Sequence, residues 1–167
     1  MKKILFVSSI ILLTTFSAHA QRGNQKWYNT AIGLRIEGGA GSSGTLGPTY
    51  ERALSSTTSV ETMILTNLST GIEGVFMHKW INTIPDVPTT VRWYCGVGLH
   101  LGTWGSKSTS FVAGPNGFLG IGYSIPDIPI NITLDWHPSV DVRMYDDNEK
   151  MRFNAAKFGF SVRYIVE

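Results

Sequence analysis

Apolar and polar residues alternate along most of this chain, which is the pattern of β-strands whose two faces meet different environments. In the clearest example, Val91, Trp93 and Cys95 alternate with Arg92 and Tyr94. The same pattern predicts eight strands, at residues 30–40, 45–54, 58–66, 71–81, 91–101, 119–124, 130–136 and 158–166. Because no stretch of helical length shows a 3.6-residue period, an all-β fold is predicted.

Short connections rich in turn residues separate the predicted strands, as at 41–44, Pro85-Asp86 and Pro126-Asp127. Such connections favour an up-and-down antiparallel topology, and eight strands are enough to close a barrel. Strands of about 10 residues suit tilted membrane-crossing strands, since typical globular strands have about 5 or 6. The predicted fold is an all-β, eight-stranded antiparallel up-and-down transmembrane β-barrel over residues 29–167.

The first 20 residues have the features of a secretory signal peptide. Lys2 and Lys3 form a charged start, residues 4–13 are apolar, and 18–20 read Ala-His-Ala, a small-x-small cleavage site. The apolar run is too short for a spanning helix, which needs about 20 residues. We therefore expect an exported protein that begins at Gln21, with residues 21–28 as an N-terminal periplasmic segment.

The composition agrees with a membrane barrel and narrows the function classes. Charged residues make up 16% of the chain, below the quarter or so of soluble domains, beside 18 glycines and 43% hydrophobic residues. The net charge is +2, with basic and acidic residues interspersed, so a nucleic-acid partner is not expected. The single cysteine, Cys95, cannot form an internal disulfide and is too far from the cleavage site to anchor a lipoprotein.

No cofactor or metal site is predicted. The glycine-rich segments at 114–117 and 120–122 lack the following helix that a nucleotide fingerprint requires, and glycine there is expected to relieve crowding inside a curved barrel. His78 and His100 fall on different predicted strands and faces, and Cys95 on the lipid-facing side. These residues do not have the spacing of a metal-ligand cluster.

Alternation alone does not distinguish a membrane barrel from a soluble lipocalin-like barrel, which keeps its apolar face inside. Two features of the faces favour the membrane. Aromatic residues on the apolar faces lie near predicted strand ends, where rings form girdles at the membrane interfaces: Tyr50, Trp80, Trp93, Tyr123, Trp136 and Tyr164. The polar faces carry both charge signs, which predicts an interior charge network of Arg35, Glu37, Glu51, Glu61, Glu73, Lys79, Arg92, Asp135 and Arg163.

The chain resembles the small eight-stranded outer-membrane barrels, such as the transmembrane domain of outer membrane protein A and the outer membrane protein X group. The resemblance lies in the alternating pattern, the length and the aromatic-rich last strand, and residues 128–136 are similar to a stretch of other outer-membrane β-barrels. The chain departs from the pattern at Glu167, where the family usually ends on an aromatic residue. The resemblance implies a Gram-negative outer membrane and assembly by its insertion machinery.

If the chain enters from the periplasm, the turns near Ser55, Pro85 and Pro126 face the periplasm. Residues 41–44, 67–70, 103–111 and 140–151 are then expected as outward-facing loops. The last of these is the most polar, and a charged run of this kind is typical of a solvated loop.

The leading functional hypothesis is a non-enzymatic barrel with an envelope-structural or surface-interaction role. Side chains just fill an eight-stranded barrel, so despite a porin-like exterior no open pore is expected. Its expected partners are outer-membrane lipids, including lipopolysaccharide, and it is expected to be a monomer.

Two alternatives stay open. Lipid A deacylases, also small eight-stranded barrels, use a histidine and a serine at the H-x-S spacing of His137 and Ser139. By this resemblance Ser139 is the nucleophile, His137 the base, and Glu149 or Asp141 the residue that orients the base. The second alternative is a soluble periplasmic barrel that binds a small apolar ligand.

Overall fold

The computed structural model describes residues 27–39, 42–69, 71–105, 110–145 and 148–166. Its ten strands are β1 (Thr30–Gly39), β2 (Ser42–Ala53), β3 (Thr58–Thr66), β4 (Gly71–Thr83), β5 (Val91–Trp104), β6 (Ser110–Ser124), β7 (Ile130–Trp136), β8 (Ser139–Tyr145), β9 (Asn148–Asn154) and β10 (Lys157–Ile165). Among the described residues no helix is long and apolar enough to cross a membrane. The predicted signal peptide and most of segment 21–28 lie outside the described residues.

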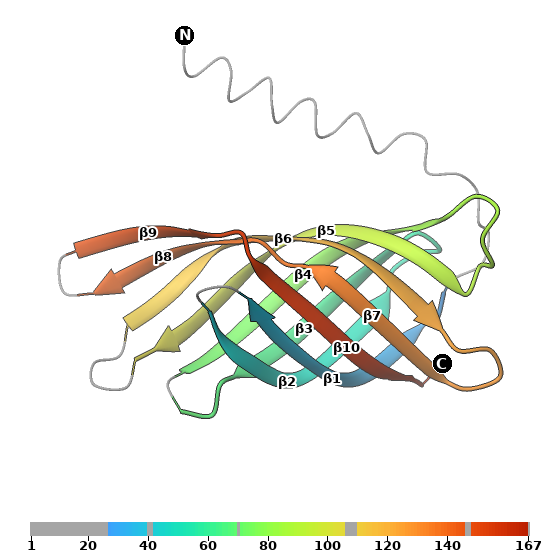
Figure 1. Ribbon diagram of the computed structural model, residues 1–167, viewed down its shortest axis with the longest axis horizontal. Coiled ribbons are helices and arrows are strands. Elements are labelled where there is room, and N and C mark those ends of the chain that lie inside the picture. Colours follow the sequence, from blue (N-terminus) through green and yellow to red (C-terminus); the bar gives the residue numbers. More distant parts are fainter. Residues whose placement is uncertain (1–26, 40–41, 70, 106–109, 146–147, 167) are drawn as a thin grey trace, which may run out of the picture.

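The ten strands make one closed antiparallel barrel of eight wall strands (Figure 1). Consecutive strands pair from β1 to β7, and β10 closes the wall by pairing with both β7 and β1. β8 continues the line of β7 against β6, because Leu119 lies opposite Trp136 and Asn116 opposite Ser139 in one unbroken register. β9 and β10 together form the last wall strand, with a one-residue shift in register between them. The predicted eight-stranded fold is thus confirmed.

Proline and a β-bulge explain why two wall strands are divided. Pro138 has no backbone N–H to donate, and the strand breaks there, although the carbonyl of Pro138 still accepts a hydrogen bond from Gly117 N at 2.9 Å. Continuing the β7–β10 register would place Asn154 opposite Val140, but β9 places it opposite Ser139. This one-residue shift reverses which side chains point inward between β9 and β10.

Three of the predicted outward loops are wrong in extent. Residues 140–151 are mostly strand, as the β8–β9 hairpin, because Val140 and Val142 alternate with Asp141 and Arg143 as strand residues do. Strand β5 runs to Trp104, and β6 begins at Ser110, before the predicted start at 119. The connection between them is therefore shorter than the predicted loop 103–111. The turn expected at 41–44 is shorter too, because β2 begins at Ser42.

The other end of the barrel carries the C-terminus and the tight turns after β2, β4 and β6 (Figure 1). Asp86 and Asp127 both adopt a left-handed backbone, each with φ of 62°, directly after a proline. Aspartate tolerates this conformation better than most residues, and proline presets the preceding position of the turn. We call this the C-terminal end of the barrel, and the opposite end the distal end.

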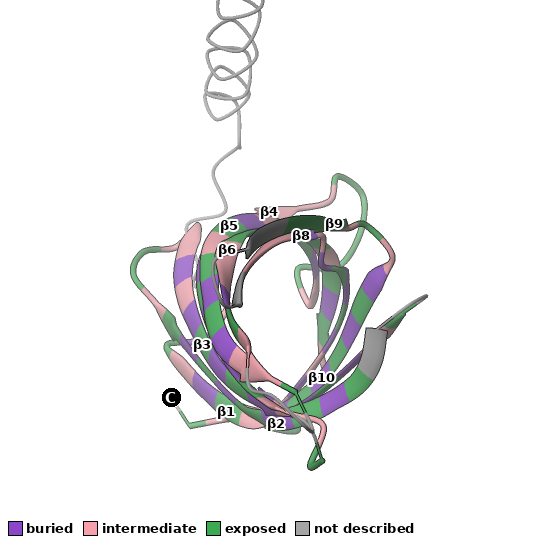
Figure 2. Ribbon diagram, turned by 90° about the vertical axis from the view of Figure 1, so that its left-hand side faces the viewer, coloured by how far each residue is buried: buried purple, intermediate pink, exposed green. Residues whose placement is uncertain are grey.

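The two faces of the wall have opposite chemistry. Along the strands, buried and exposed residues alternate (Figure 2). Leucine, isoleucine, valine and aromatic side chains make up most of the exposed positions, whereas charged side chains point into the barrel and are buried. Apolar exterior and charged interior are the reverse of a soluble domain, and they match a wall that contacts lipid.

Candidate functional site

All nine charged residues predicted to face the interior are buried in the structure. They come from β1, β2, β3, β4, β5, β7 and β10, so seven strands contribute to one polar interior. Most of them gather in two ion clusters, which follow one another along the barrel axis. A third group of polar residues lies closer to the distal end.

The cluster nearer the C-terminal end, here the Lys79 cluster, consists of Lys79, Glu51, Glu61 and Arg163. Lys79 Nζ lies 2.8 Å from Glu51 Oε2 and 2.7 Å from Glu61 Oε2, so one ammonium group is shared by two carboxylates. Arg163 donates to Glu61 and lies 3.5 Å from Glu51. Two cations and two anions therefore neutralise one another within a fully buried group.

Hydroxyl groups satisfy the remaining carboxylate oxygens of this cluster. Tyr28 donates to Glu51 Oε2 at 2.8 Å, and Ser59 donates to Glu51 Oε1 at 2.6 Å. Thr49 donates to Glu61 Oε1 at 2.5 Å. Buried charges are tolerated only when they are both paired and hydrogen-bonded, and each carboxylate here meets both conditions.

The second cluster, here the Arg35 cluster, joins Arg35 and Lys157 to Asp135 and Glu37. Arg35 donates to both carboxylate oxygens of Asp135, at 2.9 and 2.5 Å, and to Glu37 at 2.6 Å. Lys157 Nζ lies 2.8 Å from Glu37 and 3.5 Å from Glu73. The two-pronged Arg35–Asp135 contact fixes the guanidinium plane as well as its charge.

Gly159 makes room for the Arg35 cluster. A Cβ atom at this position would lie 1.9 Å from Arg35 Nη2, so any side chain would displace the guanidinium. The relief of crowding expected of the glycines at 120–122 is supported at Gly120, where a Cβ atom would lie 2.6 Å from Asp135 Cβ.

Apolar side chains fill the interior between the charges, and the sequence predicted only part of them. The buried apolar cluster consists of Met63, Leu65, Val75, Met77, Ile81, Tyr94 and Phe118. The alternation along residues 71–81 predicts Val75 and Met77 on the same face as Glu73 and Lys79, and the structure confirms it. The inward placement of Met63, Leu65 and Phe118 was not predicted. Tyr94 bridges both kinds of contact, because its hydroxyl donates to Asp135 at 2.7 Å while Lys79 Nζ lies 4.2 Å from its ring centroid.

The end of the N-terminal segment enters the same interior. Of segment 21–28, only Trp27 and Tyr28 are described, and Trp27 packs against the apolar cluster while Tyr28 is buried against Glu51. The Trp27 ring occupies the space beside Gly122, where a Cβ atom would lie 2.1 Å from it. These two aromatic rings fill the barrel next to the Lys79 cluster.

The third group, here the distal polar group, is His100, Asn116, Ser139 and Asp141. Ser139 donates to Asp141 Oδ1 at 2.9 Å, and His100 Nε2 lies 3.4 Å from the same oxygen. His100 and Asp141 approach each other from strands on either side of β6, where Gly114 presents no side chain between them. Within the described residues, the Asn116 amide and His100 Nδ1 are buried without a hydrogen-bond partner.

The structure separates the residues of the hydrolase hypothesis. His137 Nδ1 lies 2.8 Å from Glu37 Oε1, and its ring stacks on Phe118 with centroids 3.9 Å apart. Ser139 is hydrogen-bonded to Asp141 instead, and among the described residues His137 Nε2 has no hydrogen-bond partner. The backbone of Glu149 lies opposite Met144 in the β8–β9 hairpin, and its side chain lies outside the described part of the structure. The histidine that approaches the Ser139–Asp141 pair is His100.

The six aromatic residues predicted to lie at the membrane interfaces are exposed, and most of them lie at one end of the barrel. Tyr50, Trp80, Trp93, Tyr123 and Tyr164 all lie within a few residues of the strand ends at the C-terminal end. Trp136 is apart from them, opposite Phe158 and Leu119, and its indole N–H donates to the carbonyl of Ala155 at 2.5 Å. The structure thus gathers five of the six predicted interfacial residues at the C-terminal end, where a distribution over both interfaces was expected.

The remaining candidates for chemistry are dispersed over the wall. Cys95 lies on the outer side of β5 as a free, half-buried thiol. His78 lies on the outer side of β4 with its ring edge against Trp80. Among the described residues, no group of three histidine, cysteine, aspartate or glutamate side chains could hold a metal ion.

Comparison with known proteins supports the fold. No family model matches the chain, and no curated protein is significantly similar. Among solved structures, the chain is similar to the N-terminal β-barrel domain of OprF from Pseudomonas aeruginosa, with 14% identity and a TM-score of 0.53 over 82% of this chain and 98% of that one. Neisserial surface protein A also matches, with 16% identity and a TM-score of 0.46 over 81% of this chain and 94% of that one. The chain therefore has the fold of the small eight-stranded outer-membrane β-barrels.

Proposed function

We propose that this protein is a non-enzymatic β-barrel of a Gram-negative outer membrane, with an envelope-structural or surface-interaction role. The observation that carries the proposal is the filled interior: paired charges and packed apolar side chains occupy the barrel, while exposed apolar residues cover its outside. A wall of this kind is stable in lipid, and its interior serves to hold the barrel together.

The filled interior argues against a general diffusion pore. Arg35, Lys79 and Arg163 extend across the barrel to carboxylates on other strands, and each has essentially no solvent-exposed surface. Water-filled channels occur in barrels with many more strands, whereas side chains just fill eight. We therefore expect a closed, monomeric barrel whose partners are outer-membrane lipids, including lipopolysaccharide, and the insertion machinery during assembly.

The outer surface separates this proposal from a soluble ligand-binding barrel. Leu34, Leu99, Ile64 and Phe76, from four different strands, are all more than half exposed. Large apolar residues exposed on every side of the wall would destabilise the protein in water. Moving each such side chain out of water stabilises it by roughly 1.5–3 kcal/mol.

The proposal is tested by expressing the protein in a Gram-negative host and measuring three quantities. We expect the protein in the outer-membrane fraction, lipid A of unchanged acylation by mass spectrometry, and vesicles containing the purified protein that admit sugars no faster than empty ones. Sugar flux through the vesicles would contradict the closed barrel. A change in lipid A acylation that Ser139→Ala abolishes would establish the hydrolase instead.

A further inference from the structure

The β8–β9 hairpin extends past the closed part of the barrel wall. The pairing of β1 with β10 ends at Gly39 and Lys157, and β9 precedes Lys157 in the chain. Within the described residues, β9 therefore pairs with β8 alone. Figure 1 shows the strands of the hairpin reaching farther at the distal end than the strands β1 and β2 do. One side of the barrel is thus taller than the other.

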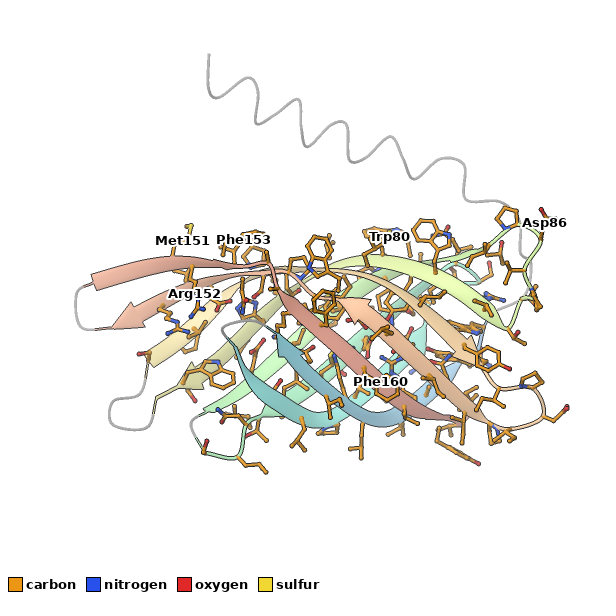
Figure 3. The ribbon with its side chains drawn as sticks, viewed as in Figure 1. Trp80, Asp86, Met151, Arg152, Phe153 and Phe160 are labelled. Atoms are coloured by element: carbon orange, nitrogen blue, oxygen red, sulfur yellow. The ribbon has the colours of Figure 1, made fainter. Side chains whose placement is uncertain are left out.

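The outer face of this hairpin is apolar. Successive strand residues point to opposite faces, so Val140, Val142, Met151 and Phe153 share the outer face. Met151 and Phe153 are 76% and 66% exposed, as much as the most exposed apolar residues of the barrel wall. In Figure 3 both side chains lie on the opposite side of β9 from Arg152.

This apolar face is continuous with the apolar exterior of the closed barrel. β8 pairs with β6, whose outer residue Phe111 lies opposite Met144, and β6 pairs with β5, which exposes Leu99 and Leu101. The surface that contacts lipid in the proposed function therefore runs on to the hairpin through Leu101, Ala113 and Val142, which lie opposite one another on β5, β6 and β8.

The charges on β9 argue against edge-to-edge pairing of the hairpin with a second copy of the chain. Consider two β9 strands that pair antiparallel, edge to edge, with their apolar side chains on the same side of the joint sheet. In the three central registers, the residues opposite each other are Lys150 and Lys150, Lys150 and Arg152, or Arg152 and Arg152. Like charges directly opposite one another destabilise a strand pair, and basic residues are a common protection of free strand edges.

We propose that the outer face of the β8–β9 hairpin, formed by Val140, Val142, Met151 and Phe153, binds the acyl chains of the surrounding lipid. The hairpin is then part of the lipid-embedded wall and not a solvated surface loop. This inference rests on the proposed membrane location. It adds that the lipid contact extends farther toward the distal end on the β5–β9 side than on the β1–β2 side.

Spin labels on single cysteines test the proposal in phosphatidylcholine vesicles, with the full barrel carrying Cys95→Ser. The labelled positions are Met151→Cys and, as a second hairpin variant, Phe153→Cys. Leu99→Cys is the wall control. Leu68→Cys is the aqueous control, because Leu68 lies between the polar residues Asn67 and Ser69 in the turn after β3, outside the barrel wall at the distal end. Unboiled electrophoretic mobility establishes that each variant is folded.

We expect labels at 151 and 153 to collide with oxygen as often as the Leu99 label, and with a water-soluble nickel chelate several-fold less often than the Leu68 label. Nickel accessibility at 151 and 153 equal to that at Leu68, with Leu99 still protected, would overturn this inference alone. Spin–spin broadening between hairpin labels would overturn it in favour of a second copy. Nickel accessibility at Leu99 as well would instead refute the proposed function.

Discussion

The Lys79 cluster and the distal polar group are both buried inside the barrel, yet they differ in how completely their groups are partnered. In the Lys79 cluster each carboxylate contacts a cation and accepts a hydrogen bond from a hydroxyl group. In the distal polar group, His100 Nδ1 and the Asn116 amide have no partner in the described structure. The comparison predicts that losing one member of an ion cluster destabilises the barrel more than losing a group of the distal polar group, because it leaves a buried charge without its partner.

The largest expected effect comes from removing the shared cation. Lys79→Met leaves Glu51 and Glu61 with one cation, Arg163, between them, and breaking a buried ion pair costs about 3–5 kcal/mol. We expect the free energy of unfolding, measured by urea titration in vesicles, to fall by that amount. Arg52→Met, on the exposed side of β2, is the matched control and should change it by less than about 0.5 kcal/mol. Equal effects of the two substitutions would contradict the role of the cluster.

Gly159→Ala is expected to lower the free energy of unfolding by a smaller amount. Its methyl group would displace the Arg35 guanidinium from Asp135, and overpacking of this kind costs about 1–3 kcal/mol. Gly38→Ala is the control, because a Cβ at Gly38 meets no atom within 4 Å. The same urea titration should separate the two variants, and a stable Gly159→Ala barrel would show that Arg35 can move without loss.

Tyr28→Phe tests whether the N-terminal segment is anchored by the Lys79 cluster. It removes one hydrogen bond to Glu51, which keeps its contacts with Lys79 and Ser59. Hydrogen bonds to charged groups contribute about 1.5–3 kcal/mol, and we expect the lower end of that range. The readout is the urea midpoint together with faster proteolysis near residue 28. An unchanged midpoint and unchanged proteolysis would mean that Tyr28 does not hold the segment in place.

The smallest change in the free energy of unfolding is expected from a substitution in the distal polar group. Asn116→Leu replaces an unpartnered buried amide by an apolar side chain of similar size, so the free energy of unfolding should stay within about 1 kcal/mol or rise. A loss as large as that of Lys79→Met would show that Asn116 is as well partnered as the ion clusters, and the contrast between the two regions would fail.

Much of the fold could be predicted because period-two alternation reports directly on the two faces of a barrel wall. The charged residues Arg35, Glu51 and Asp135 fell on the correct face because only the interior offers them partners. Met63 and Phe118 were harder, since apolar residues occur on both faces of this wall.

The β8–β9 hairpin and the pairing within the candidate site could not be read in the same way. Asp141 and Arg143 suggested a solvated loop, although Val140 and Val142 already carried the alternation of a strand. His137 and Ser139 are close in sequence, but they point to different partners from opposite sides of the break at Pro138. The pairing of charged side chains depends on how the barrel closes, and the spacing of residues in the sequence does not encode that pairing.

Electrophoresis of isolated outer membranes, with boiled and unboiled samples side by side, tests the central claim most directly. A closed barrel with an apolar exterior and a paired-charge interior should stay folded in detergent, so we predict outer-membrane protein whose mobility changes only on boiling. Protein released by osmotic shock without detergent, with the same mobility before and after heating, would contradict the lipid-facing assignment of the outer surface.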